Sequence, residues 1–288
     1  MHSAIESMLK RYDCRTPSDF KNALKELMQE IALLGLARQS FFQHAAFYGG
    51  TALRIAHGLG RFSEDLDFTL ERADKTFDLA PYLKGVEEEF SAYGLKLTAE
   101  KRTKASASDV DSAFLKANTL EHLLMIEGLQ YSTRGTNKND VIKIKLEVDT
   151  NPPPPAGKPE VKFLLEPIPF SYRILTLPSL FGGKLHALLC REYKGGRIKG
   201  RDYYDFLWYI SKNVRPDLAY LKGKLCESGV WKDEDPFTLD DLKALLRKRF
   251  STTDWAQAKT DVAPFVRNGR ELEAWSEPLF SALIDKLK

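Results

Sequence analysis

Apolar residues recur at helical spacing early in the chain and then form shorter runs. After Thr16-Pro17-Ser18-Asp19, a favourable helix start, apolar positions follow at steps of three and four from Phe20 to Leu34, which predicts an amphipathic helix. The short apolar runs Ala45 to Tyr48, which ends at two glycines, and Leu66 to Leu70 predict buried strands. Between them, Thr51 to Leu59 predicts a helix that ends at Gly60.

The middle of the chain favours a sheet. Val141 to Val148 alternates strictly between apolar and polar residues, the pattern of a strand with one buried face. Ala80 to Tyr93 predicts a helix, Leu95 to Lys101 a strand, and Lys104 to Asp111 a loop. Phe163 to Phe170 contains two prolines and predicts an edge strand, because proline cannot donate to a central ladder.

From Leu177 onward the pattern becomes helical. A leucine stripe runs toward Gly195-Gly196, and an aromatic-rich helix is expected over Tyr203 to Ile210. Three more helices are expected over Leu218 to Cys226, Leu239 to Phe250 and Leu272 to Leu287. We therefore predict an α+β fold with a mixed sheet and flanking helices over residues 1–176, followed by a helical domain over residues 177–288.

Composition is that of a soluble globular protein, with 43% hydrophobic and 29% charged residues. The net charge of +3 is too small to indicate nucleic-acid binding by itself. No segment approaches the roughly 20 apolar residues that span a bilayer. The three cysteines are far apart and form neither a zinc spacing nor a disulfide framework, so we expect a reduced, cytoplasmic protein.

Candidate chemistry begins where the first strand meets Gly49-Gly50-Thr51. Glycines at a helix start expose backbone N–H groups that bind phosphate, and a threonine hydroxyl adds a donor. Asp65 and Asp67 lie two apart on the second strand and should share one face. Their mutual repulsion would be relieved by a cation with oxygen ligands, such as Mg²⁺. The alternative is a surface strand whose acids face water.

A third carboxylate is expected on the alternating strand. Glu147 and Asp149 share its polar face with Lys143 and Lys145, so either acid could complete a metal site. The competing interpretation is an ordinary amphipathic strand with a solvated polar face.

Four segments together resemble the motif pattern of the AbiEii/AbiGii toxins, a family of the polymerase-beta-like nucleotidyltransferases. They are GGTALRIAHGLGRFSEDLDF, IKIKLEVDTNPP, LPSLFGGKLHALLCR and GRDYYDF, and they span residues 45 to 210 in the family's order. The resemblance implies a polymerase-beta-like core and a helical domain that contributes to the active-site cleft. It also implies roles for the following residues: Gly49, Gly50, Thr51 and Ser63 in nucleotide binding, Asp65, Asp67 and Glu147 as metal ligands, Lys184 at the nucleotide, and Asp202 with Asp205 as further catalytic acids.

The same resemblance implies a reaction and partners. Relatives transfer nucleotides to RNA, some to the acceptor end of tRNA, and belong to toxin–antitoxin or phage-defence pairs. We therefore expect an NTP substrate, two Mg²⁺ ions, an RNA acceptor, release of pyrophosphate, and a cognate antitoxin protein. Modification of a small molecule or a protein, or an inactive binding module of the same fold, are the alternatives.

Features of the helical half have plainer interpretations. Lys184 follows two glycines at an expected helix start and could reach a triphosphate or simply face solvent. Asp202 could be a helix N-cap, or, like Asp205, could orient Lys184 by a salt bridge. The basic cluster of Arg191, Lys194, Arg197, Lys199 and Arg201 could hold RNA phosphates or be a solvated loop. The aromatic residues Tyr203, Tyr204, Trp208 and Tyr209 suit a core better than base stacking.

Overall fold

The chain folds into two units, one built on a sheet and one helical. The computed structural model describes residues 2–101, 119–127, 142–191 and 198–288. The first unit comprises residues 1–52, 62–152 and 159–174, and the second comprises 53–61, 153–158 and 175–288. The helical unit thus includes two short segments that the predicted boundary at residue 176 assigns to the first domain.

The first unit holds a seven-stranded mixed sheet in the order β3-β4-β5-β2-β1-β7-β6. β1 is antiparallel to β2 and parallel to β7, while β2 is parallel to β5. The strands are β1 Ala45–Tyr48, β2 Leu66–Leu70, β3 Lys96–Lys101, β4 Thr119–Glu127, β5 Ile142–Asp149, β6 Pro159–Leu164 and β7 Phe170–Leu175. The helices of this half are α1 Ser3–Leu9, α2 Pro17–Arg38, α3 Gly49–His57 and α4 Ala80–Ala92, with a 3₁₀ turn η1 at Phe41–Gln43.

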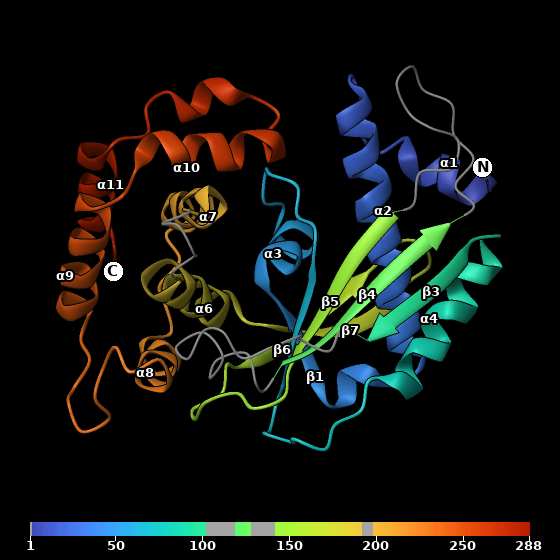
Figure 1. Cartoon of the computed structure of the whole chain (residues 1–288), viewed down its shortest axis with the longest axis horizontal. Helices are drawn as coiled ribbons and strands as arrows, with labels where there is room; N and C mark the ends of the chain where they lie inside the picture. Colours follow the sequence, from blue (N-terminus) through green and yellow to red (C-terminus); the bar gives the residue numbers. More distant parts are fainter. Residues whose placement is uncertain (1, 102–118, 128–141, 192–197) are drawn as a thin grey trace. The chain divides into compact units, whose positions relative to one another are not determined.

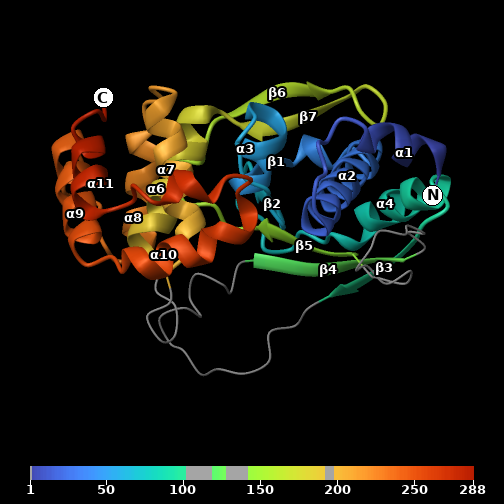
Figure 2. The ribbon, with the colours of Figure 1, turned by 90° about the horizontal axis from the view of Figure 1, so that it is seen from above.

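Helix α2 forms the centre of this unit. The helix starts where the sequence predicts, and Thr16 caps it and forms a capping box with Asp19. From Glu26 to Leu36 every residue is buried, because the β6–β7 and β3–β5 ends of the sheet lie on opposite sides of the helix (Figure 2). A helix enclosed in this way buries its polar residues too, and Glu26, Gln29 and Glu30 are among them.

The second unit is a group of helices (Figure 1), and aromatic side chains form part of its core. Its helices are α6 Leu177–Cys190, α7 Gly200–Ser211, α8 Leu218–Glu227, α9 Leu239–Ser251, α10 Trp255–Val262 and α11 Glu277–Ile284, with 3₁₀ turns η3 Ala263–Phe265 and η4 Gly269–Leu272. Phe181 of α6 stacks on Tyr209 of α7 with ring centroids 4.3 Å apart. Phe250 packs edge-on against both Phe206 and Phe280.

The predicted α+β fold with C-terminal helices is confirmed, but several elements differ. The single edge strand expected over 163–170 is wrong: Pro167 and Pro169 lie between two strands, β6 and β7. Helix α3 begins at Gly49, earlier than expected, and the last helix is shorter. Strand β4 and helices α1 and α10 were not predicted. The expected loop at 104–111 and the break at Gly195-Gly196 lie outside the described residues.

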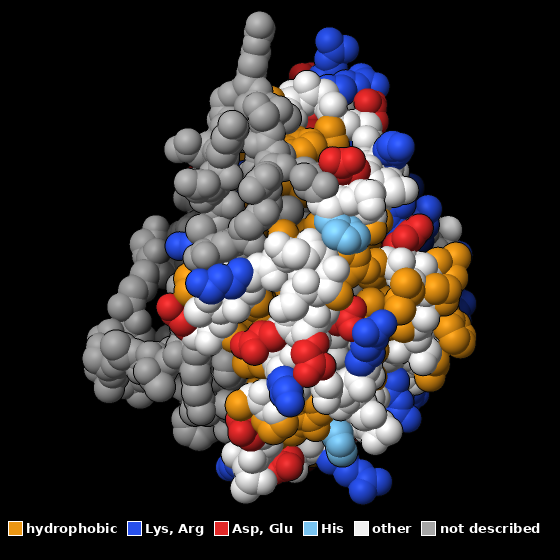
Figure 3. Space-filling model, turned by 90° about the vertical axis from the view of Figure 1, so that its right-hand side faces the viewer, with side chains coloured by type: hydrophobic (Ala, Val, Ile, Leu, Met, Phe, Trp, Pro, Cys, Tyr) orange, Lys and Arg blue, Asp and Glu red, His pale blue; other side chains and the backbone are white. Residues whose placement is uncertain are grey.

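Surface hydrophobicity is concentrated in one place. Among the described residues, four of the five large hydrophobic side chains that are exposed lie between Val161 and Ile168. Hydrophobic side chains gather at the edge of the face in Figure 3. None of the described helices is long and apolar enough to cross a membrane.

Candidate active site

The turn between β1 and α3 touches the acidic strand directly. Gly49 has φ +82°, a conformation that favours glycine. A Cβ atom at Gly49 would lie 2.4 Å from the Asp67 Oδ2 atom, far inside contact distance. The turn therefore requires glycine for two reasons, and it places Gly49, the first residue of α3, beside the Asp67 carboxylate. A helix N-terminus of this kind carries partial positive charge and suits phosphate.

Asp67 lies in β2, and Asp65 lies immediately before the strand. Leu66 and Phe68 are fully buried, whereas Asp65 and Asp67 are half-buried. The alternation of the strand therefore turns Asp67 to the face opposite the core. Asp67 pairs in register with Tyr48, the last residue of β1, so the acidic strand and the glycine turn meet at one end of the sheet.

The register of β5 distinguishes the two candidates for a third acid. Glu147 is the partner of Asp67 across the parallel pair, whereas Asp149 is the partner of Thr69, further from the glycine turn. The Asp149 carboxylate accepts a hydrogen bond from the Asn151 N–H at 3.1 Å and closes the turn after the strand. Glu147 is therefore the acid that lies beside Asp67.

A metal ion suits this set by ligand type, since carboxylate oxygens are the ligands of Mg²⁺. The side chains do not converge on one point, however: within the described ranges no three His, Cys, Asp or Glu residues form a group that could hold a metal. Glu147 instead pairs with Lys145, whose Nζ is 2.6 Å from Oε1. A shared ion would have to displace this lysine.

Two other residues of the motif, Thr51 and Ser63, make hydrogen bonds within the protein. Thr51 is fully buried, and its hydroxyl donates a hydrogen bond to the Asp65 carbonyl oxygen. The expected phosphate contact of this hydroxyl is therefore not what the geometry provides; Thr51 fixes the loop that carries Asp65. The Ser63 carbonyl oxygen accepts a hydrogen bond from Gln29 Nε2 at 3.3 Å.

Helix α2 supports the same loop, a contribution that sequence reasoning missed. Besides the Gln29 contact, Lys25 Nζ lies 3.1 Å from Glu64 Oε1. Lys25 and Gln29 are one helical turn apart and hold consecutive residues of the loop. The one available signal was Gln29 itself, a polar residue within the apolar stretch of that helix.

In the helical unit, Lys184 is held by two carboxylates. Its Nζ lies 2.7 Å from Asp202 Oδ1 and 2.8 Å from Asp205 Oδ2. Arg61 Nε and Nη2 donate to the two oxygens of Asp205 at 2.7 and 2.6 Å. Arg61 was not predicted, and it lies 144 residues from its partner.

Two local expectations for this cluster were wrong. Helix α6 begins at Leu177, so Lys184 lies in its middle and not at its start. The N-cap of α7 is Lys199, so Asp202 is not a cap. Both differences have the same cause, since each helix begins before the residues that suggested its start. As a result, Lys184 on α6 faces Asp202 and Asp205 on α7.

Neighbouring cations explain why Asp202 stays ionised. Burial opposes ionisation of Asp202, but Lys184, Arg191 and Lys199 outweigh it and hold the pKa of the Asp202 carboxyl well below its ordinary value. Burial and the charge of Arg191 lower the pKa of Lys199 to about 8. The buried Arg61 and the partly exposed Lys184 thus face the two buried carboxyl groups of Asp202 and Asp205.

The remaining candidates of the helical half divide between surface and core. Arg191 lies 3.6 Å from Asp202, and the Arg201 guanidinium lies over the Phe265 ring at 4.2 Å. Lys194 and Arg197 lie outside the described residues. Tyr203 and Tyr209 are buried, which agrees with a core role for the aromatic stripe.

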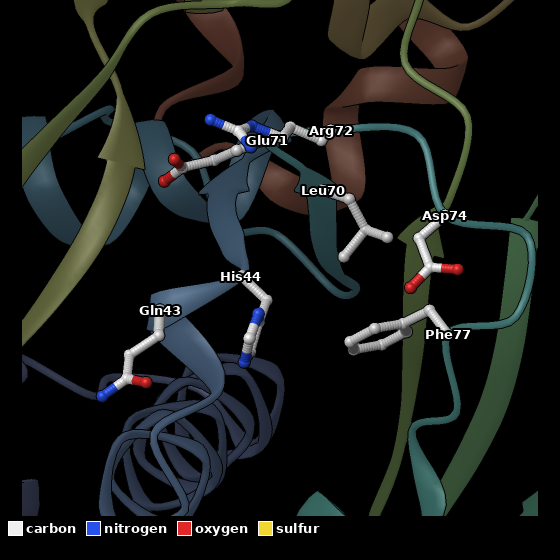
Figure 4. Close-up of a pocket in the computed structure, with 7 residues that line it drawn as sticks. All are labelled: Gln43, His44, Leu70, Glu71, Arg72, Asp74 and Phe77. Carbon is white, nitrogen blue, oxygen red and sulfur yellow. The ribbon is translucent and has the colours of Figure 1, made fainter.

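A cavity of 340 Å³ lies elsewhere, lined by residues that include His44, Leu70, Arg72 and Phe77 (Figure 4). Leu70 is the register partner of Ala45, the first residue of β1. The cavity therefore opens at the end of these strands opposite Gly49 and Asp67. It contains none of the predicted site residues.

Comparison with known proteins identifies a family for the chain. Residues 31–285 match the family described as nucleotidyl transferase AbiEii toxin, type IV TA system. A comparison with curated proteins found no match.

Solved structures give three similar chains. JHP933 from Helicobacter pylori is 17% identical with a TM-score of 0.51, covering 90% of each chain. A candidate nucleotidyltransferase from H. pylori is 18% identical with a TM-score of 0.50, covering 89% of this chain and 91% of that one. MenT4, a nucleotidyltransferase toxin from Mycobacterium tuberculosis H37Rv, is 17% identical with a TM-score of 0.48, covering 100% of this chain and 99% of that one. The two H. pylori structures share the fold.

Proposed function

The chain belongs to the AbiEii family of nucleotidyltransferase toxins, and from that premise we propose that it transfers a nucleoside monophosphate from an NTP to a hydroxyl group of RNA. The observation that carries the proposal is the meeting of Gly49 with Asp67, in register with Glu147. The closeness of a helix N-terminus to two carboxylates supports the proposal, because nucleotide chemistry needs groups that bind phosphate next to groups that bind a metal ion.

In the proposed reaction an oxygen of an RNA hydroxyl forms a bond to the α-phosphorus of the NTP. The bond from that phosphorus to the β-phosphate bridging oxygen breaks, pyrophosphate leaves with the electron pair, and the hydroxyl proton passes to a carboxylate or to solvent. Bound Mg²⁺, as two ions on Asp65, Asp67 and Glu147, would supply charge that acidifies the hydroxyl and offsets the leaving group. The N–H groups at Gly49 and Gly50 would hold the phosphates.

Lys184 is proposed to bind the triphosphate. An ammonium between Asp202 and Asp205, at 2.7 and 2.8 Å, is held in a fixed position, and Arg61 in turn fixes Asp205 through both oxygens. Preorganisation of this kind lets a cation act without reorganising during the reaction. Asp202 and Asp205 would then serve the reaction by positioning Lys184.

The partners follow from the family. A toxin of a toxin–antitoxin system implies a cognate antitoxin protein, and the basic residues Arg191 and Arg201 suit an RNA acceptor such as the 3′ end of tRNA. The test is incubation with each of four α-labelled NTPs and with total RNA, purified tRNA or a protein lysate, followed by separation of labelled products. Label on RNA supports the proposal. Label confined to protein or to small molecules contradicts it.

A further inference from the structure

Strand β6 carries an unusually apolar surface for the edge of a sheet. It is the terminal strand in the order of the seven. The exposed fractions of Val161 and Phe163 in the strand are 59 and 72%, and that of Leu165, the residue after it, is 70%. Ile168, just beyond the strand, is 43% exposed. In the view of Figure 3, hydrophobic side chains gather at the right-hand edge, on the side away from the grey residues. Patches of this kind on a soluble protein mark interaction sites.

The strand's second face is charged. Val161 and Phe163 alternate with Glu160 and Lys162, which point to the opposite side and lie 3.8 Å apart. An edge strand also presents unpaired N–H and C=O groups that can pair with another strand. Pro159 at its start, and Pro167 after its end, limit any such pairing to a short segment.

We propose that β6 pairs antiparallel with β6 of a second copy of this chain, about a two-fold axis through Val161. Charge complementarity selects both the partner and the register. This axis sets Glu160 opposite the partner's Lys162, and Lys162 opposite the partner's Glu160, so that the four charges alternate in sign. On the other face, Val161 meets the partner's Val161 and Phe163 meets the partner's Pro159.

Neighbouring registers are disfavoured by charge. An axis through Lys162 sets two lysines opposite each other, and an axis through Phe163 sets Glu160 opposite the partner's Glu166; like charges directly opposite destabilise a sheet. The segment that pairs is short, and small interfaces are weak. The dimer should therefore dissociate reversibly on dilution.

Sedimentation velocity of the full chain over a dilution series tests the proposal. We expect the mass to rise with concentration from 32.7 kDa toward twice that value. Phe163→Ser should keep the chain monomeric, whereas Val230→Ser, at an exposed apolar residue of the helical unit, should not. Thermal unfolding confirms that both variants fold.

A charge exchange tests the register. Glu160→Lys alone and Lys162→Glu alone should each dimerise less than the wild type, because each sets like charges opposite one another. An equimolar mixture of the two variants should dimerise again, because every opposing pair then joins a lysine to a glutamate. If the wild-type chain stays monomeric at every concentration, the proposal is overturned, and a different protein becomes the candidate partner of β6. Failure of the mixture to recover dimer, with both single variants weakened, overturns the register.

Discussion

Replacement of Arg61 by methionine should destabilise the helical unit strongly. The side chains of Arg61 and Asp205 are 2 and 0% exposed, and two hydrogen bonds of 2.7 and 2.6 Å join them. Arg61→Met retains an apolar stem and removes the charge, which leaves a buried carboxylate with one cation fewer. Removing one partner of a buried ion pair costs about 3–5 kcal/mol. Because Lys184 Nζ remains 2.8 Å from Asp205, we expect the lower end, about 3 kcal/mol.

Tryptophan fluorescence during urea unfolding measures this change selectively. All four tryptophans of the chain, at positions 208, 231, 255 and 275, lie in the helical unit. The matched control is Arg247→Met, which breaks an ion pair of similar length, 2.7 Å, whose side chains are 52 and 69% exposed. Exposed pairs contribute about 0–1 kcal/mol. Equal losses in the free energy of unfolding for the two variants would refute the role assigned to burial.

Three further predictions concern Gly49, Glu30 and Lys184. Gly49→Ala should abolish transfer because the new Cβ atom meets Asp67 Oδ2. The control is Gly58→Ala: Gly58 has φ +72° and no atom within 4 Å of a built Cβ, so this variant carries the backbone strain alone and should retain transfer. Equal losses of activity in the two variants would contradict this reasoning. Burial raises the pKa of Glu30 from 4.5 to about 7 despite Arg11. The folded chain therefore holds a proton on Glu30 at pH values where the unfolded chain has lost it. The free energy of unfolding should fall as the pH rises from 4.5 to 7, by at most about 3 kcal/mol. Glu30→Gln should reduce that fall in urea titrations at pH 5 and 8; an unchanged fall would exclude Glu30 as its source. Lys184→Ala should raise the KM for NTP and lower kcat, and Lys184→Arg should restore only part of each, because a planar guanidinium replaces a compact ammonium poorly; full activity in Lys184→Ala would remove it from the site.

Strong periodicity made much of the fold predictable. The strand at 142–149 follows from alternation, and the helix from Pro17 follows from its start residues and its apolar spacing, which are local properties of the sequence. β4 was missed because TLEHLLMIE mixes consecutive apolar residues with charges and shows no single period. One edge strand was expected in place of β6 and β7 because the five residues between them, Leu165 to Pro169, include two apolar residues and two prolines.

In the site, too, local features of the sequence were predictable and contacts between distant residues were not. Gly49, Asp65 and Asp67 belong to one short motif, so their proximity could be inferred from the chain alone. Arg61 with Asp205, and Gln29 with Ser63, join residues distant in sequence, and no local pattern encodes such contacts. The phosphate role expected for the Thr51 hydroxyl depended on whether the side chain is exposed, which tertiary packing decides.

The central claim is tested most directly by transfer of label from an α-labelled NTP to RNA. The proteins to compare are the wild type, Asp65→Ala, Asp67→Ala and a control, Asp235→Ala, in an exposed loop. The account predicts that both active-site variants lose transfer while their melting temperatures stay near that of the wild type, because two adjacent carboxylates repel each other and removing one costs little stability. The control should match the wild type, and EDTA should abolish its activity. Transfer that persists in Asp67→Ala, or a large fall in its melting temperature, would contradict the account and make the acidic strand a structural feature.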